Sequence, residues 1–283
     1  MKTLALASAD FWSYIRLMQQ DDSHSLAISG VNWLGLATLC RREIWRFLKV
    51  WNQTLFAPMV STLLFLAILT LAMGRGTQFV DGLPYKEFVA PGLIMMAVVQ
   101  NAFANTSSSL MLAKIQGVII DILMPPLSAG EITLAYLVGG VVRGMMVCVS
   151  VSVGLYIFVP FTIHDPVLAL YFLLMSSSLL ALLGILGGIY AQSFDQMAAF
   201  TNYCITPLSF LSGTFYSIAH LPGFWHTASH FNPFFYMIDG FRYAMTGHAD
   251  GNISVGTLVL LTMNLALWAL CRHLIQTGWR LKS

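Results

Sequence analysis

The chain has 283 residues, of which 57% are hydrophobic and only 9% are charged, and its net charge is +2. These values exclude a soluble globular protein, and the small net charge gives no basis for a nucleic-acid-binding surface. Six apolar runs are long enough to cross a hydrocarbon core of about 30 Å as helices. The sequence therefore predicts an all-α polytopic membrane protein with six transmembrane helices, at Leu55–Met73, Pro91–Ala113, Ile132–Val159, Val167–Ala191, Ala198–Ala219 and Ile253–Cys271.

The first 31 residues show no cleavable signal peptide. They are expected to form an N-terminal extension, which the distribution of basic residues places in the cytoplasm. Residues 32–53 then alternate tryptophans with basic side chains, which predicts an amphipathic helix in the membrane interface before the first span. This helix either anchors the chain to anionic lipid headgroups or also docks a cytoplasmic partner. Glu43 favours docking, because attraction to anionic headgroups does not explain an acidic residue there.

Orientation follows from the basic residues near the ends of the spans, because Lys and Arg are enriched in cytoplasmic loops. With the N-terminus inside, ten basic residues are cytoplasmic and three are external, and the external ones are Arg75, Lys86 and Arg242. Both termini are therefore expected in the cytoplasm. The loop at 114–131 is then internal, and it contains a short amphipathic segment that Pro125–Pro126 ends.

Arg143 falls near the middle of the third predicted span. A central arginine costs about 2.5–3.5 kcal/mol on insertion scales, so it is expected to face protein or water. It either lines a translocation path or gate, or forms a structural hydrogen-bonding hub with polar groups of other spans. Gly140 and Gly144 in the same span, and Gly184 and Gly188 in the next, allow close helix packing within the chain or between two copies.

The fifth predicted span is interrupted by Pro207 and ends with the adjacent rings Phe215 and Tyr216. These rings either close the path to water, with one packed on Trp225, Phe231 and Phe234, or simply pack at the interface. The following segment, His220–His248, is too polar to span and predicts a re-entrant external hairpin before the last span. Such a hairpin either marks a translocation path or caps the bundle.

Motifs for catalysis are absent from the sequence. It contains no Gly-Lys dipeptide and hence no Walker A loop, no H-E-x-x-H and no G-x-S-x-G. The four cysteines stand singly, so they indicate neither a disulfide nor a zinc site. We expect a chain that is not an enzyme and that carries no cofactor or metal of its own.

Four strings resemble the membrane subunits of ABC-2 type exporters, in particular bacterial inner-membrane transport permeases of the YadH type. They are RFLKVWNQTLFAP at Arg46–Pro58, FVAPGLIMMAV at Phe88–Val98, PLSFLSGTFYSIAHLPGFW at Pro207–Trp225 and FNPFFYMIDGFRYA at Phe231–Ala244. The resemblance implies an ABC-2 transmembrane domain at 54–273, a cytoplasmic tail at 274–283 and a location in the bacterial inner membrane.

The resemblance also implies a homodimer bound to two copies of a separate ABC ATPase subunit, which binds ATP and magnesium. In such permeases the interfacial helix and the first internal loop receive the ATPase. On this chain the matching residues are Arg41, Arg42, Glu43, Arg46, Lys114, Asp121, Pro125 and Glu131. The first, second and fifth spans resemble those that line the path at the dimer seam. The substrate stays open, because related permeases export polysaccharides, lipids or hydrophobic drugs.

An ATP-independent channel or secondary carrier is the alternative function. Carriers usually concentrate ionisable residues at the midplane and often contain inverted repeats. This chain has one such residue, Arg143, and no evident repeat. A co-purifying ATPase would separate the two classes. An intramembrane enzyme is a weaker third possibility, because no catalytic constellation is visible.

Overall fold

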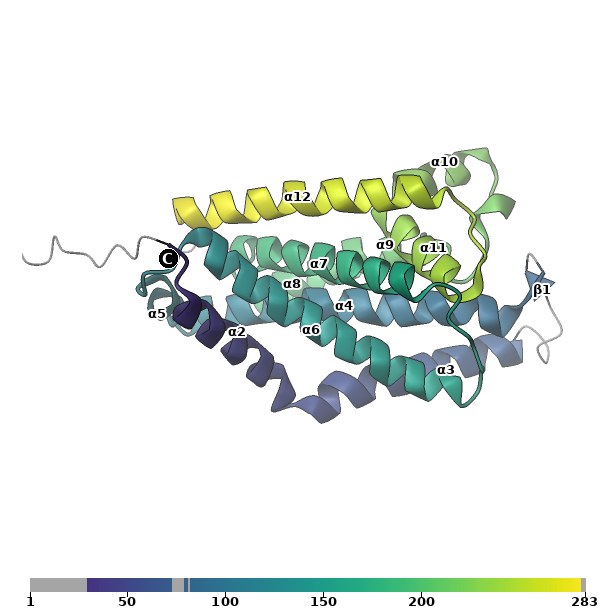
Figure 1. The fold of residues 1–283 in the computed structure, drawn as a ribbon, viewed down its shortest axis with the longest axis horizontal. Coiled ribbons are helices and arrows are strands. Elements are labelled where there is room, and N and C mark those ends of the chain that lie inside the picture. Colours follow the sequence, from purple (N-terminus) through teal and green to yellow (C-terminus); the bar gives the residue numbers. More distant parts are fainter. Residues whose placement is uncertain (1–29, 73–78, 81, 281–283) are drawn as a thin grey trace, which may run out of the picture.

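A computed structural model describes residues 30–72, 79–80 and 82–280, so the expected extension at 1–31 lies almost wholly outside the described residues. The described chain is a bundle of helices whose longer members run side by side (Figure 1). These helices are α2 (Trp33–Leu48), α3 (Ala57–Ala72), α4 (Tyr85–Ile115), α5 (Ile119–Leu123), α6 (Ala129–Tyr156), α7 (Pro166–Tyr190), α8 (Phe194–Phe200), α9 (Thr206–Phe210), α10 (Gly223–Phe231), α11 (Pro233–Thr246) and α12 (Ile253–Thr277).

Shorter elements join or extend these helices. The π-helical segments η1 (Asn52–Phe56) and η2 (Thr201–Ile205) lie directly before α3 and α9, and a 3-10 turn, η3, covers Ile218–His220. The strands β1 (Phe79–Val80) and β2 (Leu83–Pro84) form a small antiparallel ribbon. This ribbon lies at the end of the bundle opposite α5 (Figure 1).

Five helices among the described residues are long and apolar enough to cross a membrane, which confirms an all-α polytopic membrane protein. They cover Asn52–Leu71, Tyr85–Ile115, Ala129–Tyr156, Pro166–Tyr190 and Ile253–Thr277. The predicted number of six spans is not confirmed, because the expected span at Ala198–Ala219 is not a continuous helix.

The expected fifth span is instead a shorter and irregular helix that runs from Phe194 to Phe210 through α8, η2 and α9. Pro207 has no backbone N–H, and the π segment immediately before it is the local adjustment that a missing donor favours. The chain then turns at Gly213, whose φ of +75° suits glycine. The hydroxyl of Thr214 donates to the carbonyl of Ser209 at 2.9 Å, so the turn satisfies part of its own backbone.

Helix α4 lies at the centre of the bundle, where it packs most extensively against α7 and α6. Apolar residues cover it nearly all round, and a helix of that kind is buried. Glycine residues allow the closest approaches between these helices. A Cβ on Gly184 would collide with Thr106 of α4, and a Cβ on Gly140 would collide with Ala181 of α7. The small-residue pairs therefore pack helices within one chain.

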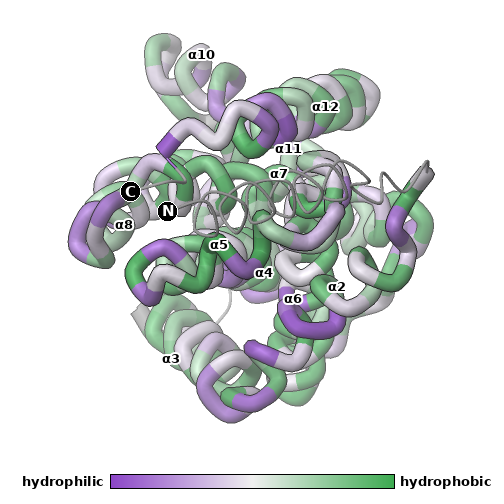
Figure 2. The backbone as a smooth tube through the Cα atoms, turned by 90° about the vertical axis from the view of Figure 1, so that its left-hand side faces the viewer, coloured by the Kyte–Doolittle hydropathy of each residue, from purple (hydrophilic) through white to green (hydrophobic). Residues whose placement is uncertain are grey.

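Helices α3 and α12 lie on opposite sides of the bundle and keep much of their surface exposed (Figure 2). The buried residues of α12 fall on one face, because they recur at helical spacing: Gly256, Leu260, Asn264, Cys271 and Ile275. Asn264 fixes this face to α7 by donating to the carbonyl of Met175 at 3.0 Å. The exposed apolar surface of both helices fits a lipid environment or another protein surface.

Helix α2 is attached to the bundle by a buried acid. The side chain of Glu43 is 0% exposed, and its carboxylate accepts a hydrogen bond of 2.7 Å from Ser109 of α4. It also pairs with Arg46 Nε at 3.4 Å and Arg42 Nε at 3.8 Å. Gly139 of α6 provides room, because a Cβ there would lie 2.8 Å from the Cβ of Glu43. The predicted role of Glu43 on a partner-facing surface is therefore corrected, since its side chain faces the bundle.

Replacement of Glu43 by Gln tests this attachment. The change keeps the shape but leaves the guanidinium of Arg46 without its ion pair and places an amide donor beside it. A donor left without its charged partner costs about 1–3 kcal/mol, so we expect the melting temperature of the purified protein to fall. Asp121→Asn is the matched control, because it removes the same charge from an exposed side chain. Equal melting temperatures for both variants would contradict this role.

Candidate docking groove and translocation cleft

A groove of about 350 Å³ lies between α2 and α5, at one end of the bundle. Its lining includes Arg42 of α2, Asp121 of α5 and Pro125, which were predicted as docking residues from two separate parts of the sequence. Arg42, Asp121 and Pro125 are all exposed. The structure thus brings an acid and a base together on an open surface, where a partner can meet both.

Other predicted docking residues are used inside the chain. The ammonium of Lys114 donates to the carbonyls of Gly188, Ile189 and Ala191, at 3.2, 2.8 and 2.9 Å. These carbonyls lie at the C-terminus of α7, where a cation is favourable. Lys114 therefore caps α7, and these three hydrogen bonds direct its ammonium away from the groove.

Glu131 has a similar internal role at the start of α6. It forms a capping box with Ser128, whose backbone N–H donates to the Glu131 carboxylate at 2.6 Å. The backbone N–H of Asn32 donates to the other carboxylate oxygen at 2.5 Å, which ties the start of α2 to the start of α6. Glu131 thus holds the start of α2 against the start of α6, close to the groove. Arg41, whose side chain is exposed, adds charge on the surface of α2.

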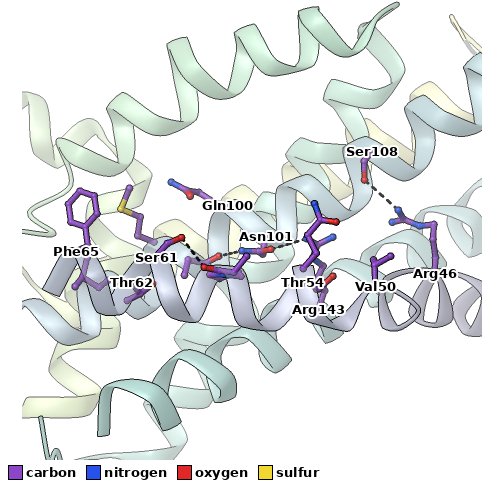
Figure 3. A pocket seen from close by; sticks show the side chains of 16 residues that line it. Arg46, Val50, Thr54, Ser61, Thr62, Phe65, Gln100, Asn101, Ser108 and Arg143 are labelled. Carbon is purple, nitrogen blue, oxygen red and sulfur yellow. Dashed lines mark hydrogen bonds between the residues drawn. The ribbon is translucent and has the colours of Figure 1, made fainter. Parts of the chain in front are cut away.

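A larger cleft of about 630 Å³ lies between α3 and α4 (Figure 3). The first and second spans form most of it, and α2 and α6 each add an arginine, whereas the expected fifth span contributes no residue to its lining. Its polar lining residues are Arg46, Gln53, Thr54, Ser61, Thr62, Gln100, Asn101, Ser108 and Arg143. The cleft therefore places many polar groups between apolar spans.

Arg143 and Arg46 occupy different depths of this cleft, with Phe65 at the far end (Figure 3). Arg143 donates from Nη2 to Asn101 Oδ1 at 2.9 Å. Arg46 donates to the backbone carbonyl and the Oδ1 of Asn105, at 2.7 and 2.9 Å. Arg143 thus lines the cleft and joins α6 to α4 through one hydrogen bond.

Phe215 lies where α3 meets the turn after α9. Its ring stacks on Phe65 of α3 at 5.7 Å and on Phe210 of α9 at 5.4 Å between ring centroids. Its backbone carbonyl accepts a hydrogen bond of 3.3 Å from Tyr85. The ring neighbours of Phe215 among the described residues are thus Phe65 and Phe210. The sequence had instead suggested the rings of the hairpin. Tyr216 donates to the carbonyl of Phe210 at 3.4 Å.

The sequence did not reveal a buried charge cluster at the same end of the bundle. Arg242 of α11 is 1% exposed and lies over the ring of Phe88, with 3.9 Å to its centroid. Its guanidinium is 3.9 Å from Asp250 and 4.0 Å from Asp239. It also donates to the carbonyl of Gly213. Arg242 therefore joins α4, α11 and the turn after α9.

Two carboxylates complete this cluster. Asp250 accepts hydrogen bonds from the hydroxyl of Ser217 at 2.9 Å and from the backbone of Ile218 at 3.0 Å. Asp239 accepts from the backbone N–H groups of Asp250 and Gly251, at 2.8 and 2.9 Å. A signal was present in the sequence, because Asp239 and Arg242 stand one helical turn apart in an apolar stretch. Arg242 was treated only as an external loop charge, so the buried cluster was not predicted.

Comparisons with protein families and with known proteins give consistent matches. The sequence model of the family described as ABC-2 type transporter matches residues 35–246. The chain is 38% identical over 251 residues to the inner membrane transport permease YadH of Escherichia coli K12, and the alignment covers 89% of this chain and 98% of that protein. Nodulation protein J of Sinorhizobium fredii is 23% identical over 240 residues, which cover 79% of this chain and 90% of that protein.

These matches confirm the resemblance that four sequence strings indicated, and they agree with a multi-pass inner-membrane transport permease. The family match covers well over half of the chain, including both walls of the groove and of the cleft. The chain therefore belongs to the ABC-2 type transporter family.

Proposed function

We propose that this chain is the permease subunit of an ATP-driven exporter. Two copies form the translocation path, and each binds a separate ABC ATPase subunit that carries ATP and magnesium. The groove between α2 and α5 carries the proposal, because it exposes Arg42 and Asp121 at one end of the bundle. The same bundle contains the polar cleft between α3 and α4. Family membership supports the assignment.

The coupling follows from the way α2 is held. ATP-driven closure of the two ATPase subunits would press on α5 and α2. Glu43 and Arg46 bind α2 to α4, and Arg46 also lines the cleft, so a displacement of α2 reaches the path directly. Spans that repack between two discrete arrangements then alternate the access of the cleft. The chain supplies the path and the coupling, and the bond chemistry takes place on the partner.

Charge reversal at Asp121 tests the docking surface. We expect Asp121→Lys to lower the amount of ATPase that co-purifies with the tagged chain by about tenfold, because a repelled charge pair costs on the order of a kcal/mol or more at an interface. Asp195→Lys is the matched control, since Asp195 is also exposed in the first turn of a short helix, α8. Co-purification that is equal for both variants would contradict docking at α5. A wild-type chain that never co-purifies an ATPase would favour the channel or carrier.

Both termini and the loop that contains α5 are proposed to be cytoplasmic, with residues 160–166 outside. Cysteine labelling in a cysteine-free background tests this orientation. We expect an impermeant maleimide to label Thr162→Cys in intact cells and to label Gln116→Cys only after the membrane is opened. Both positions are exposed and lie outside the long spans. Labelling of the cysteine at 116 in intact cells would reverse the orientation.

The ring of Phe215 is proposed to close the outer end of the cleft, because it stacks on Phe65 of the cleft lining. Tyr216 is adjacent to Phe215, and the irregular helix that contains Pro207 leads to both rings. We expect Phe215→Ala to make proteoliposomes leak a small entrapped solute without ATP, at least about tenfold faster than wild type. A hydrophobic constriction excludes water only while its rings meet.

Phe224→Ala is the control for this leak, since Phe224 is an exposed ring of α10 at the same end of the bundle. Its replacement removes a ring of the same size without opening the cleft. A Phe215→Ala protein that melts at a lower temperature and yet stays as tight as wild type would assign the ring to packing alone.

A further inference from the structure

The charge balance of the cleft between α3 and α4 is uneven. Two arginines line it, and the part of the chain that the structure describes contributes no aspartate or glutamate to the lining. Arg46 is nevertheless compensated, because Glu43 lies 3.4 Å from its Nε on the bundle side. Arg143 has no such partner within the described residues, where it donates to the neutral amide of Asn101. One positive charge of the lining is therefore left without a counter-charge.

The donors of Arg143 are also incompletely used. Its Nε atom is buried and has no acceptor among the described residues. A guanidinium has five N–H donors in a planar fork that matches the oxygens of a carboxylate or a phosphate. An unmatched cation in a membrane span is costly, and residues of this kind mark substrate or ion paths. The missing partner is thus expected to be an anion.

We propose that the cleft binds an anionic group of the transported molecule, such as a phosphate or a carboxylate, beside Arg143. This inference rests on the proposed function, because it takes the cleft to be the path. Gln100 and Asn101 lie on the adjacent turn of α4 and supply amide groups, while Ser61 and Thr62 supply hydroxyls from α3 (Figure 3). These neutral groups can donate hydrogen bonds to an anion, and none of them carries a negative charge that would repel it.

Binding can be measured on the purified full chain without any ATPase. The probe is dihexanoyl phosphatidic acid, and dihexanoyl phosphatidylcholine is its comparison, because the two share their acyl chains and differ in headgroup charge. We expect a saturable rise in melting temperature with the phosphatidic acid alone. The Arg143→Gln variant should weaken its apparent affinity by about tenfold or more, because a charge-assisted fork is lost.

A second variant keeps the test valid if Arg143→Gln fails to fold. Asn101→Asp keeps the side-chain shape and places a carboxylate 2.9 Å from the guanidinium, so the chain would supply its own anion. We expect this variant to fold and to lose the response to phosphatidic acid. Arg272→Gln is the control, because it removes an exposed arginine from α12, on the opposite side of the bundle from α3. It should respond like the wild-type chain.

The source of the anion is resolved by a third probe. A response to glycerol 3-phosphate as well as to phosphatidic acid supports recognition of a free anionic group, and a response to phosphatidic acid alone supports an anionic amphiphile. The inference is overturned if phosphatidylcholine acts equally, or if Arg143→Gln and Asn101→Asp respond as wild type does. Because no ATPase is present, this failure is separate from a failure of docking, which the Asp121 experiment measures.

Discussion

Every charge inside this apolar bundle needs a partner, and that requirement organises the structure. Glu43 is the clearest case, because its buried carboxylate joins α2 to α4 through Ser109 and holds Arg46 in place. At the other end Arg242 serves the same purpose with Asp239 and Asp250. An ion pair broken on one side would leave an uncompensated charge at low dielectric, which costs more than the pair gains. The two clusters therefore specify how the helices meet.

The position of these clusters relates them to function. Residues of α2 line both the groove and the cleft, with Arg42 in the groove and Arg46 in the cleft, so this helix is a wall that the two share. Arg242 binds the carbonyl of Gly213, two residues before Phe215. The turn that presents Phe215 to Phe65 is thus fixed by a buried charge. A buried charge cluster therefore lies near each end of the cleft, with Glu43 and Arg46 at one end and Arg242 with its two aspartates at the other.

The sequence predicted the helices that depend on local composition. Long apolar runs identified five spans, and the alternation of Trp with basic residues located the helix that became α2. It did not predict the side of α2 that Glu43 faces, because burial of an acid depends on Ser109, a residue distant in the chain. The capping roles of Lys114 and Glu131 were not predicted for the same reason, since a capping role depends on where other helices begin and end.

The expected fifth span shows a second limit of sequence reasoning. Hydropathy over Ala198–Ala219 suits a span, but the geometry is determined by Pro207, Gly213 and the hydroxyls between them. The first span has the same construction, with the π segment η1 before Pro58. In both helices a missing N–H donor disturbs the regular ladder of hydrogen bonds one turn earlier. Kinks concentrate at such points, and both the helix that lines the cleft and the helix that leads to Phe215 contain one, at Asn52–Phe56 and at Thr201–Ile205.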